Sequence, residues 1–322
     1  MKLNRNQIIL AAVLVAQVAL SVVVLWPRRG TAGAIEPFFA GLPDTEVVAL
    51  TITDDAGASI TLRKVTGAWV YPAGDDYPAD GDYLTPLLDK IAALDTRRLV
   101  TRTDASHKQL KVAGDDFVRR IQLETADGAA HTLYIGSSPS YGASHVRVEG
   151  TSETYLANDV SQWDFGVNPV PWVDSTYFSV SQDDVQEVTL TNANGTFTFA
   201  KDEAGNWTLV GLAADEELDT AEVSSIVTKV TQVTMNRPLG RELFAEYGMD
   251  QPLAVVTLKK EAETITLSVG AQDPGDSTYV VNVSTSPYYV RLNDYNVRPL
   301  VEDARSDLLV PPPTPTPEET TS

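Results

Sequence analysis

The sequence "DAGASITLRKVTGAW" (Asp55–Trp69) recurs, with changes, as "NANGTFTFAKDEAGNW" (Asn192–Trp207). Both stretches alternate polar and apolar residues on either side of a Gly-containing turn, which is the pattern of a β-hairpin. Both end on Gly-x-Trp. We therefore expect the same hairpin twice, each followed by a third strand that turns its tryptophan, Trp69 or Trp207, into a hydrophobic core.

The match continues along the chain. "HTLYIG", ending at Gly136, corresponds to "ITLSVG", ending at Gly270, and a tyrosine follows each glycine nineteen residues later, Tyr155 and Tyr289. The offset is 138 residues at the tryptophans and 134 residues at the glycines. Solenoid repeats run about 20 to 50 residues, so a period this long indicates a whole domain. The sequence predicts two tandem copies of one unit.

A helix is predicted after the third strand of each copy. In "DGDYLTPLLDKIAALDT" leucine and isoleucine recur at spacings of three and four, and Pro86 belongs in the first turn, so the helix starts near Asp82 or Thr85. In the second copy, "LDTAEVSSIVTKV" has Asp219 as its cap. Four strands follow the first helix, in "RRIQLETADGAAHTLYIG", "ASHVRVEG" and "ETYLAN". Each copy is therefore predicted as β-β-β-α-β-β-β-β, an α+β unit with one main helix on a mostly antiparallel sheet.

The predicted organisation has six segments. They are a tail and transmembrane anchor (1–29), a linker (30–43), the first α+β repeat (44–165), a second linker (166–178), the second α+β repeat (179–308) and a disordered Pro/Thr-rich tail (309–322).

The anchor is predicted from "IILAAVLVAQVALSVVVLW", Ile8–Trp26, which contains no charge. At about 1.5 Å per residue this run is about 28 Å long, close to the ~30 Å hydrocarbon thickness of a bilayer. We expect a single-pass membrane protein with its N-terminus in the cytoplasm and its bulk outside. The alternative is a cleaved signal peptide, because "AGA" at Ala32–Ala34 has the form of a cleavage site.

Charge and composition exclude some partners. The formal net charge is −20, and after residue 29 there remain 20 basic and 44 acidic residues, or −24. Such a body repels nucleic acid and anionic lipid headgroups, so the expected membrane contact is the apolar run itself. The chain has no cysteine, which excludes disulfides and thiolate metal sites.

No histidine cluster predicts a metal site. His131 and His145 fall on adjacent predicted strands, but Ile265 and Tyr279 stand at these positions in the second copy. A third ligand is also lacking, so we interpret both as strand histidines. His107 is interpreted as a surface residue.

The acidic stretch "GDDYPADGD" (Gly74–Asp82) resembles a calcium loop, but an EF-hand register on Asp76 places Pro78 at the third ligand position and Leu87 at the twelfth, where Glu is required. We interpret it as a loop with a helix N-cap. "GSSPSYG" (Gly136–Gly142) is interpreted as a Ser/Gly loop.

The chain contains no G-x-S-x-G, Walker-type or G-x-G-x-x-G motif. The sequence therefore predicts no catalytic residues, no cofactor-binding residues, no metal ligands and no cofactor, and the protein is expected not to be an enzyme. Trp163 and Trp172, near the second linker, are expected to pack between the repeats, with partner binding as the alternative.

The chain resembles the domain of unknown function 4340 (DUF4340) family of bacterial proteins. The resemblance rests on the N-terminal anchor, on "G-x-x-T-F-x-K-x-x-x-G-x-W" at Gly195–Trp207, and on "EYGMDQPLAVVTL" (Glu246–Leu258) before "ITLSVG". The first copy has "SHKQLKVAGDDF" in place of the "YGMDQP" segment. The resemblance implies a membrane-tethered protein, in some cases encoded near components of gliding-motility-type ABC transporters, and it brings no catalytic residues.

Three functions are compatible with these features. The first is a membrane-anchored, non-enzymatic interaction or accessory module, associated with such a transporter or another membrane protein complex. The second is a structural protein of the envelope or cell surface, and the third is an envelope hydrolase of unrecognised type. Exposed edge strands in either copy would allow a partner to add a strand.

Overall fold

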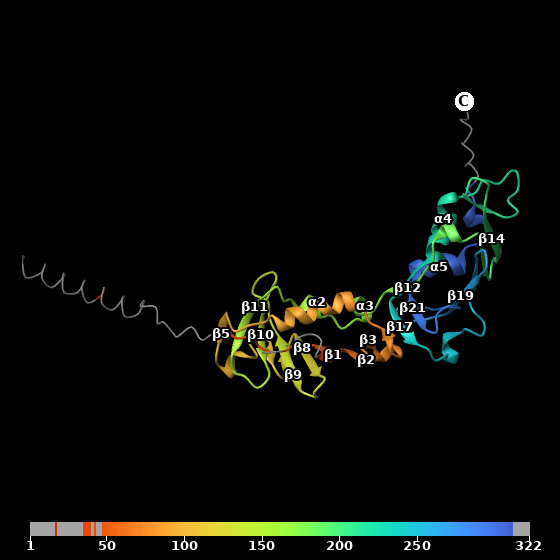
Figure 1. The fold of residues 1–322 in the computed structure, drawn as a ribbon. Coiled ribbons are helices and arrows are strands. Elements are labelled where there is room, and N and C mark those ends of the chain that lie inside the picture. Colours follow the sequence, from red (N-terminus) through yellow and green to blue (C-terminus); the bar gives the residue numbers. More distant parts are fainter. Residues whose placement is uncertain (1–16, 18–34, 40–41, 43–46, 312–322) are drawn as a thin grey trace, which may run out of the picture.

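The computed structural model describes residues 17, 35–39, 42 and 47–311, and Figure 1 shows them as an elongated, bent molecule. Apart from Gln17, the predicted anchor Ile8–Trp26 lies outside the described residues, as does the tail from residue 312. No helix within the described ranges is both long enough and apolar enough to cross a membrane.

Two large antiparallel sheets dominate the described residues. The first has the strand order β4-β3-β2-β1-β8-β9-β10-β11-β5, and the second has the order β15-β14-β13-β18-β19-β20-β21-β17. The strands of the first sheet are β1 (Val47–Asp54), β2 (Ser59–Val65), β3 (Ala68–Tyr71), β4 (Tyr77–Pro78), β5 (Leu99–Thr101), β8 (Arg119–Thr125), β9 (Ala130–Ile135), β10 (Ala143–Val148) and β11 (Thr154–Asn158). Those of the second are β13 (Glu187–Asn192), β14 (Gly195–Lys201), β15 (Trp207–Leu209), β17 (Arg237–Gly240), β18 (Ala254–Lys259), β19 (Thr264–Gln272), β20 (Tyr279–Val283) and β21 (Tyr289–Leu292).

Smaller elements complete the fold. Two short sheets pair β6 (Val112–Ala113) with β7 (Asp116–Phe117) and β12 (Thr176–Ser179) with β16 (Gln232–Thr234). The α-helices are α2 (Gly81–Ala92), α3 (Pro169–Trp172), α4 (Thr220–Thr231) and α5 (Asp294–Glu302). Short 3₁₀ turns include η2 (Pro72–Gly74), η4 (Gln162–Phe165), η6 (Ala245–Tyr247) and η7 (Arg305–Leu308).

The predicted hairpins form as β1–β2 and β13–β14. Leu50 faces Leu62 in the first, and Leu190 faces Phe197 in the second. All four residues are buried, because alternate positions of a strand point to the same face and here that face lies on the core. The α+β class with a mostly antiparallel sheet is therefore confirmed.

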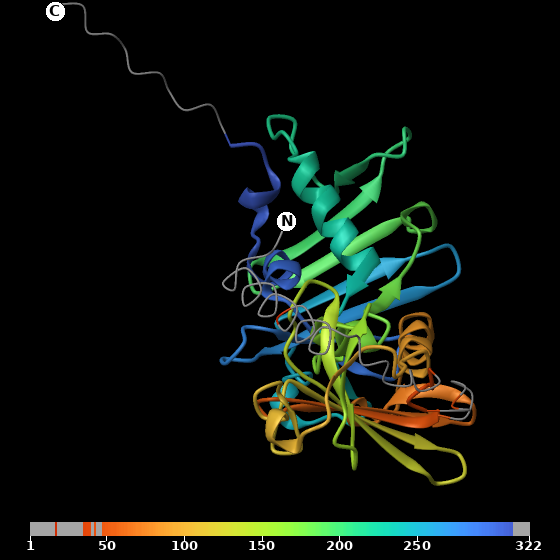
Figure 2. The same ribbon diagram turned by 90° about the vertical axis from the view of Figure 1, so that its left-hand side faces the viewer.

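Each sheet carries a helix on one face, and Figure 2 shows α4 running across the second sheet. The carboxylate of Asp80 accepts backbone N–H bonds from Asp82 and Tyr83, so α2 begins at Gly81, slightly before the predicted start. Asp219 caps α4 in the same manner, as predicted. The apolar face of each helix is buried, with Leu84, Leu87, Leu88 and Ile91 on α2 and Val223, Ile226, Val227 and Val230 on α4.

Each sheet and its helix enclose a separate hydrophobic core. Phe39 and Leu42, from the segment predicted as a linker, are buried in the first core. In the segment 166–178, Trp172 belongs to the first core and Tyr177 to the second. At the C-terminal end, Leu309 forms a bridge with Leu218, so the chain stays packed past the predicted start of the tail.

The predicted strand count is wrong in one respect. After the helix each large sheet gains five strands, since β5 joins β11 at one edge of the first sheet and β17 joins β21 at one edge of the second. These strands have three and four residues, too few for a period of two to stand out in the sequence. Pro238 lies in β17, and an edge strand tolerates proline because one side of it needs no donor.

Trp69 and Trp207 pack against the two cores, as predicted, but each is only partly buried. In each case the ammonium of a lysine on the neighbouring strand lies over the ring. The Nζ atom of Lys64 is 5.2 Å from the ring centroid of Trp69, and that of Lys201 is 5.2 Å from the centroid of Trp207. Such cation–π contacts favour a ring that stays partly exposed.

The two halves meet where the acidic stretch Gly74–Asp82 contacts the second sheet. Gly74 packs directly on Pro238 of β17, and a Cβ on this glycine would lie 2.8 Å from the Cγ atom of Pro238. The hydroxyl of Tyr288 donates to the carbonyl oxygen of Asp76 at 3.2 Å. The helix cap at Asp80 is as predicted, but the predicted loop also contains the short strand β4, and its position at the junction was not predicted.

Tyr77 is the main apolar contact of this junction. It belongs to the first sheet by its backbone, yet its side chain is buried in the core of the second half, with its ring centroid 4.8 Å from that of Tyr288. Burial, reinforced by Asp174 and the nearby tyrosines, raises the pKa of Tyr77. The junction therefore combines an edge-to-face aromatic pair with close backbone packing.

Candidate functional site

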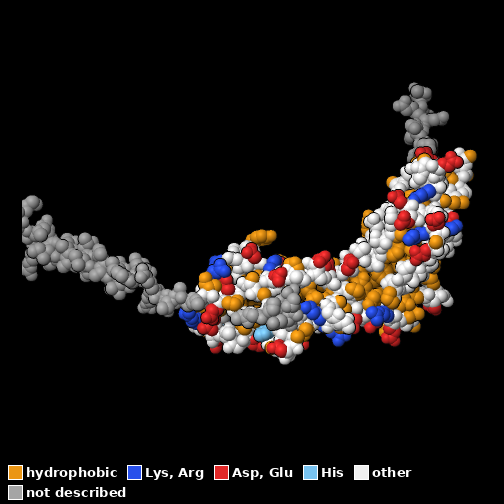
Figure 3. All heavy atoms as spheres, in the orientation of Figure 1, with side chains coloured by type: hydrophobic (Ala, Val, Ile, Leu, Met, Phe, Trp, Pro, Cys, Tyr) orange, Lys and Arg blue, Asp and Glu red, His pale blue; other side chains and the backbone are white. Residues whose placement is uncertain are grey.

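Two fully or largely exposed aromatic side chains border one hollow of the first half. Tyr141 is fully exposed, and Trp163 is 80% exposed. Both line a hollow of about 640 Å³ whose other lining residues are mostly small or polar. On the space-filling view, hydrophobic side chains stand out from the rim of the first half (Figure 3). We call this feature the Tyr141–Trp163 surface.

Local sequence fixes both aromatic residues in place. Trp163 lies in η4, where Ser161 and Asp164 form a reciprocal capping box. Tyr141 lies in the turn between β9 and β10, where Ser140 bridges Ala143 and Gly142 takes a positive φ of 70°. Rigid turns hold these rings in water instead of folding them onto the core.

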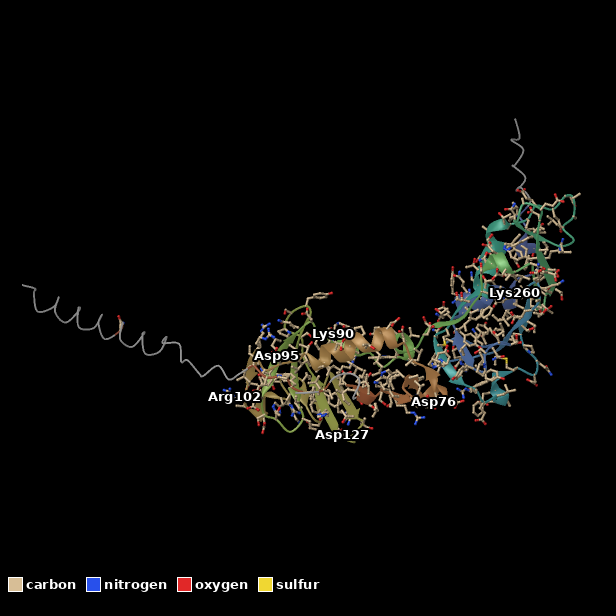
Figure 4. All side chains as sticks on the ribbon, in the orientation of Figure 1. Asp76, Lys90, Asp95, Arg102, Asp127 and Lys260 are labelled. Carbon is tan, nitrogen blue, oxygen red and sulfur yellow. The ribbon has the colours of Figure 1, made fainter. Side chains whose placement is uncertain are left out.

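A second hollow, of about 410 Å³, adjoins the first, because Lys90 and Asp159 line both. It is more basic, with Arg97 and Arg98 on its wall. Figure 4 shows Lys90 and Asp95 at this end of the first half. The Lys90 ammonium pairs with Asp164 at 3.3 Å, which ties α2 to the turn that carries Trp163.

This arrangement suits binding. Exposed tyrosine and tryptophan rings offer large apolar area and a polar edge at low conformational cost, and such residues concentrate the binding energy of protein interfaces. The hydroxyls of Ser138, Ser140 and Ser161 supply hydrogen-bonding groups between the rings.

The sequence singled out Trp163 but did not identify Tyr141. Trp163 was expected to pack between the repeats together with Trp172, and both expectations are wrong. Trp172 is fully buried in the first core, where its indole N–H donates to the carbonyl oxygen of Gly166 at 2.7 Å and its ring meets Tyr83 edge-on. Tyr141 was missed, although an aromatic residue in a Ser/Gly loop was the available signal, since "GAQDPGD" in the second copy has none.

The histidines do not form a cluster. His131 faces Leu123 near the start of β9, while His145 lies beside Gly136 past the other end of that strand. His107 is buried, contrary to the prediction of a surface residue, because its Nε2 lies 3.0 Å from the carbonyl oxygen of Ser152. Among the described residues, no group of three or more histidine and acidic side chains could hold a metal ion.

Ser137 and His145 are the nearest approach to a nucleophile and base. The hydroxyl of Ser137 lies 3.1 Å from His145 Nδ1, but this nitrogen is also 2.8 Å from the carbonyl oxygen of Ser137. A carbonyl can only accept, so Nδ1 carries the proton and cannot take one from the hydroxyl. The pair lacks the geometry of an activated nucleophile.

The comparisons with known proteins give a family and no relative. Neither the curated proteins nor the solved structures contain a match to the chain. The family model for a domain of unknown function (DUF4340) matches residues 69–239. This range starts in β3 and ends in β17, so it spans the junction and coincides with neither predicted repeat. Because the match covers just over half of the 322 residues, the chain belongs to the DUF4340 family.

Proposed function

We propose that the protein is a membrane-anchored, non-enzymatic interaction module, made of two tandem copies of one α+β unit. It binds a membrane protein complex through the Tyr141–Trp163 surface. The single observation that carries the binding role is the pair of exposed aromatic side chains on one hollow.

Strand order supports the tandem copies. From β3 to β5 in the first sheet and from β15 to β17 in the second, corresponding strands lie in the same order. The main helix follows β15 in the second half and follows β3 and the short β4 in the first. The aspartate caps and the lysine–tryptophan contacts also recur. Only β4 is extra, and it lies at the junction.

Two glycines support the same conclusion at atomic detail. A Cβ on Gly136 would lie 2.1 Å from the carbonyl oxygen of Leu110, and one on Gly270 would lie 2.0 Å from that of Tyr247. The residue after each carbonyl has a positive φ, 58° at Lys111 and 66° at Gly248. The divergent "SHKQLKVAGDDF" segment thus makes the same backbone approach as "EYGMDQP", which explains why glycine stands at both positions, directly after β9 and near the end of β19.

The anchor and the partner class come from the sequence. The uncharged run Ile8–Trp26 has the length of a membrane helix. The family resemblance favours a gliding-motility-type ABC transporter, or a related membrane complex, as the partner. The non-enzymatic role is favoured by the blocked nitrogen of His145.

A pull-down from the native membrane in mild detergent tests this function. We expect the full-length chain to recover transporter subunits, the form starting at Gly30 to lose them, and Tyr141→Ala/Trp163→Ala to lose them with its anchor intact. Tyr295→Ala removes another exposed aromatic side chain (78%) from the second half and is expected to recover the same subunits as the wild type. Recovery of the chain alone would contradict the accessory role and favour a free-standing envelope protein.

A further inference from the structure

The junction between the halves is a contact between two different edges. We call residues 72–77 the leading edge of the first half and residues 237–241 the trailing edge of the second half. One ion pair crosses the junction, between the carboxylate of Asp75 and the guanidinium of Arg241 at 3.9 Å. Asp76 pairs with Arg63 of its own half, and Arg237 pairs with Asp276 of its own half. Pro238 and Gly240 are buried there.

Each half has both kinds of edge. The trailing edge of the first half and the leading edge of the second half are not part of the junction and lie at the ends of the molecule. β5 lies beside β11 as β17 lies beside β21, so residues 97–102 are the trailing edge of the first half. β15 lies beside β14 as β3 lies beside β2, so residues 210–217, which follow β15 as residues 72–77 follow β3, form the leading edge of the second half. Figure 1 places β5 and β14 toward opposite ends of the molecule.

The free trailing edge is basic and apolar. Residues 97–100 are all exposed, with Leu99 at 37% and Val100 at 45%, whereas Pro238 and Gly240 at the junction are buried. The arginines of this edge are Arg97, Arg98 and Arg102, and Figure 4 shows Arg102 at the end of the first half.

The free leading edge is acidic and apolar. Val210 is 55% exposed, and the exposed acids of this edge are Asp215 and Glu217. Hydrogen bonds from the Arg305 guanidinium and the Ala213 backbone lower the pKa of Glu216 to about 2. Glu216 is thus ionised but neutralised by its ion pair with Arg305, and the negative charge of this edge comes from the exposed Asp215 and Glu217.

We propose that the leading edge of one copy docks on the trailing edge of a second copy of this chain, head to tail. The charges match in the same sense as at the junction, acids on arginines, and Val210 meets Leu99 and Val100. Because the two surfaces differ, the contact is heterologous and can repeat along a ring or an open filament. It uses none of the residues that line the hollow between Tyr141 and Trp163, although Arg97 and Arg98 line the hollow beside it.

The contact is weaker than the junction. In the second half Glu216 occupies the position equivalent to Tyr77, and in the first half Thr154 occupies the position equivalent to Tyr288. The contact between two chains therefore lacks the aromatic pair of the junction. At about 0.15 M salt the Debye length is about 8 Å, so the repulsion between two chains of net charge −20 is screened while close pairs persist.

Disulfide trapping tests the proposal, because the chain has no cysteine of its own. Full-length Val100→Cys and Val210→Cys chains are mixed in mild detergent under oxidising conditions. We expect a cross-linked dimer from the mixture and a ladder of multimers from the double variant. Tyr295→Cys, exposed but on neither edge, replaces either partner as the control.

Charge reversal separates specific docking from random collision. Arg98→Glu/Arg102→Glu in the Val100→Cys chain should lower the yield at least about fivefold, and Asp215→Lys/Glu217→Lys in the Val210→Cys chain should restore it. A yield no greater than with Tyr295→Cys would overturn the proposal, as would insensitivity to charge reversal. A low cross-linking yield or insensitivity to charge reversal would leave the proposed function, which the pull-down tests, unaffected.

Discussion

Tyr77 places its ring edge-to-face on Tyr288, with the centroids 4.8 Å apart, although 211 residues of sequence separate them. Tyr77 lies in β4 of the first sheet, and Tyr288 lies directly before β21 of the second. The hydroxyl of Tyr288 also bonds to the backbone of Asp76, next to Tyr77. One side chain of the first half thus completes the core of the second.

Tyr77→Ala is expected to lower the free energy of unfolding by about 3 kcal/mol, because it leaves a cavity in the second core and removes the aromatic pair. Urea unfolding of the full-length chain in mild detergent measures this change. The matched control is Tyr141→Ala, which removes the same side chain from a fully exposed site and should change stability by less than about 0.5 kcal/mol. Equal effects of the two variants would contradict the role of Tyr77.

Gly136→Ala and Gly270→Ala are each expected to destabilise the protein by about 3 kcal/mol, because the new methyl group would overlap the carbonyl oxygen of Leu110 or Tyr247. Thermal unfolding measures both. Gly166→Ala, where a Cβ would meet no atom within 4 Å, is the control and should be nearly neutral. If only one of the two variants were destabilised, the structural equivalence of Gly136 and Gly270 would be wrong.

Asp303 gives a pH-dependent prediction. Burial, together with Glu222, Asp307 and Glu302, raises its pKa to about 6, and its Oδ2 has no hydrogen-bond partner within the described residues. A raised carboxyl pKa means that the folded state favours the proton. This contribution is fully present below the unfolded pKa of about 3.8 and is lost as the pH rises through about 6.

Asp303→Asn cannot ionise, so we expect it to be more stable than the wild type at pH 7.5, by about 1 kcal/mol because solvent screens this partly exposed group. The difference should vanish below about pH 4. Unfolding midpoints across this pH range, with the exposed Asp250→Asn as control, check it. A variant less stable than the wild type at pH 7.5 would contradict the pKa shift.

The sequence predicted the elements with long, regular patterns. The hairpins β1–β2 and β13–β14, the strands β8 to β11, and the caps Asp80 or Asp219 with their helices follow from local alternation and local hydrogen bonding. The edge strands β5 and β17 could not be predicted in this way. They have only three and four residues at a sheet edge, and such strands are defined by their partner strand and not by their own pattern.

The site was less predictable than the fold. Burial of His107 and of Trp172, and exposure of Trp163, depend on which segments meet in space. Local sequence cannot distinguish Trp172, which is buried edge-on against Tyr83, from Trp163, which is exposed nine residues earlier. The junction is the clearest case, since the acidic loop looked like a plain helix cap until its contact with Pro238 and Tyr288 was known.

Site-specific photo-cross-linking in the native membrane tests the central claim most directly. A photoreactive amino acid replaces Trp163 in the full-length chain, and another copy of the probe replaces Tyr295 as the control. The account predicts cross-links from position 163 to a membrane protein complex that position 295 does not reach. If position 163 captured nothing beyond what position 295 captures, the Tyr141–Trp163 surface would not be the binding surface of this protein.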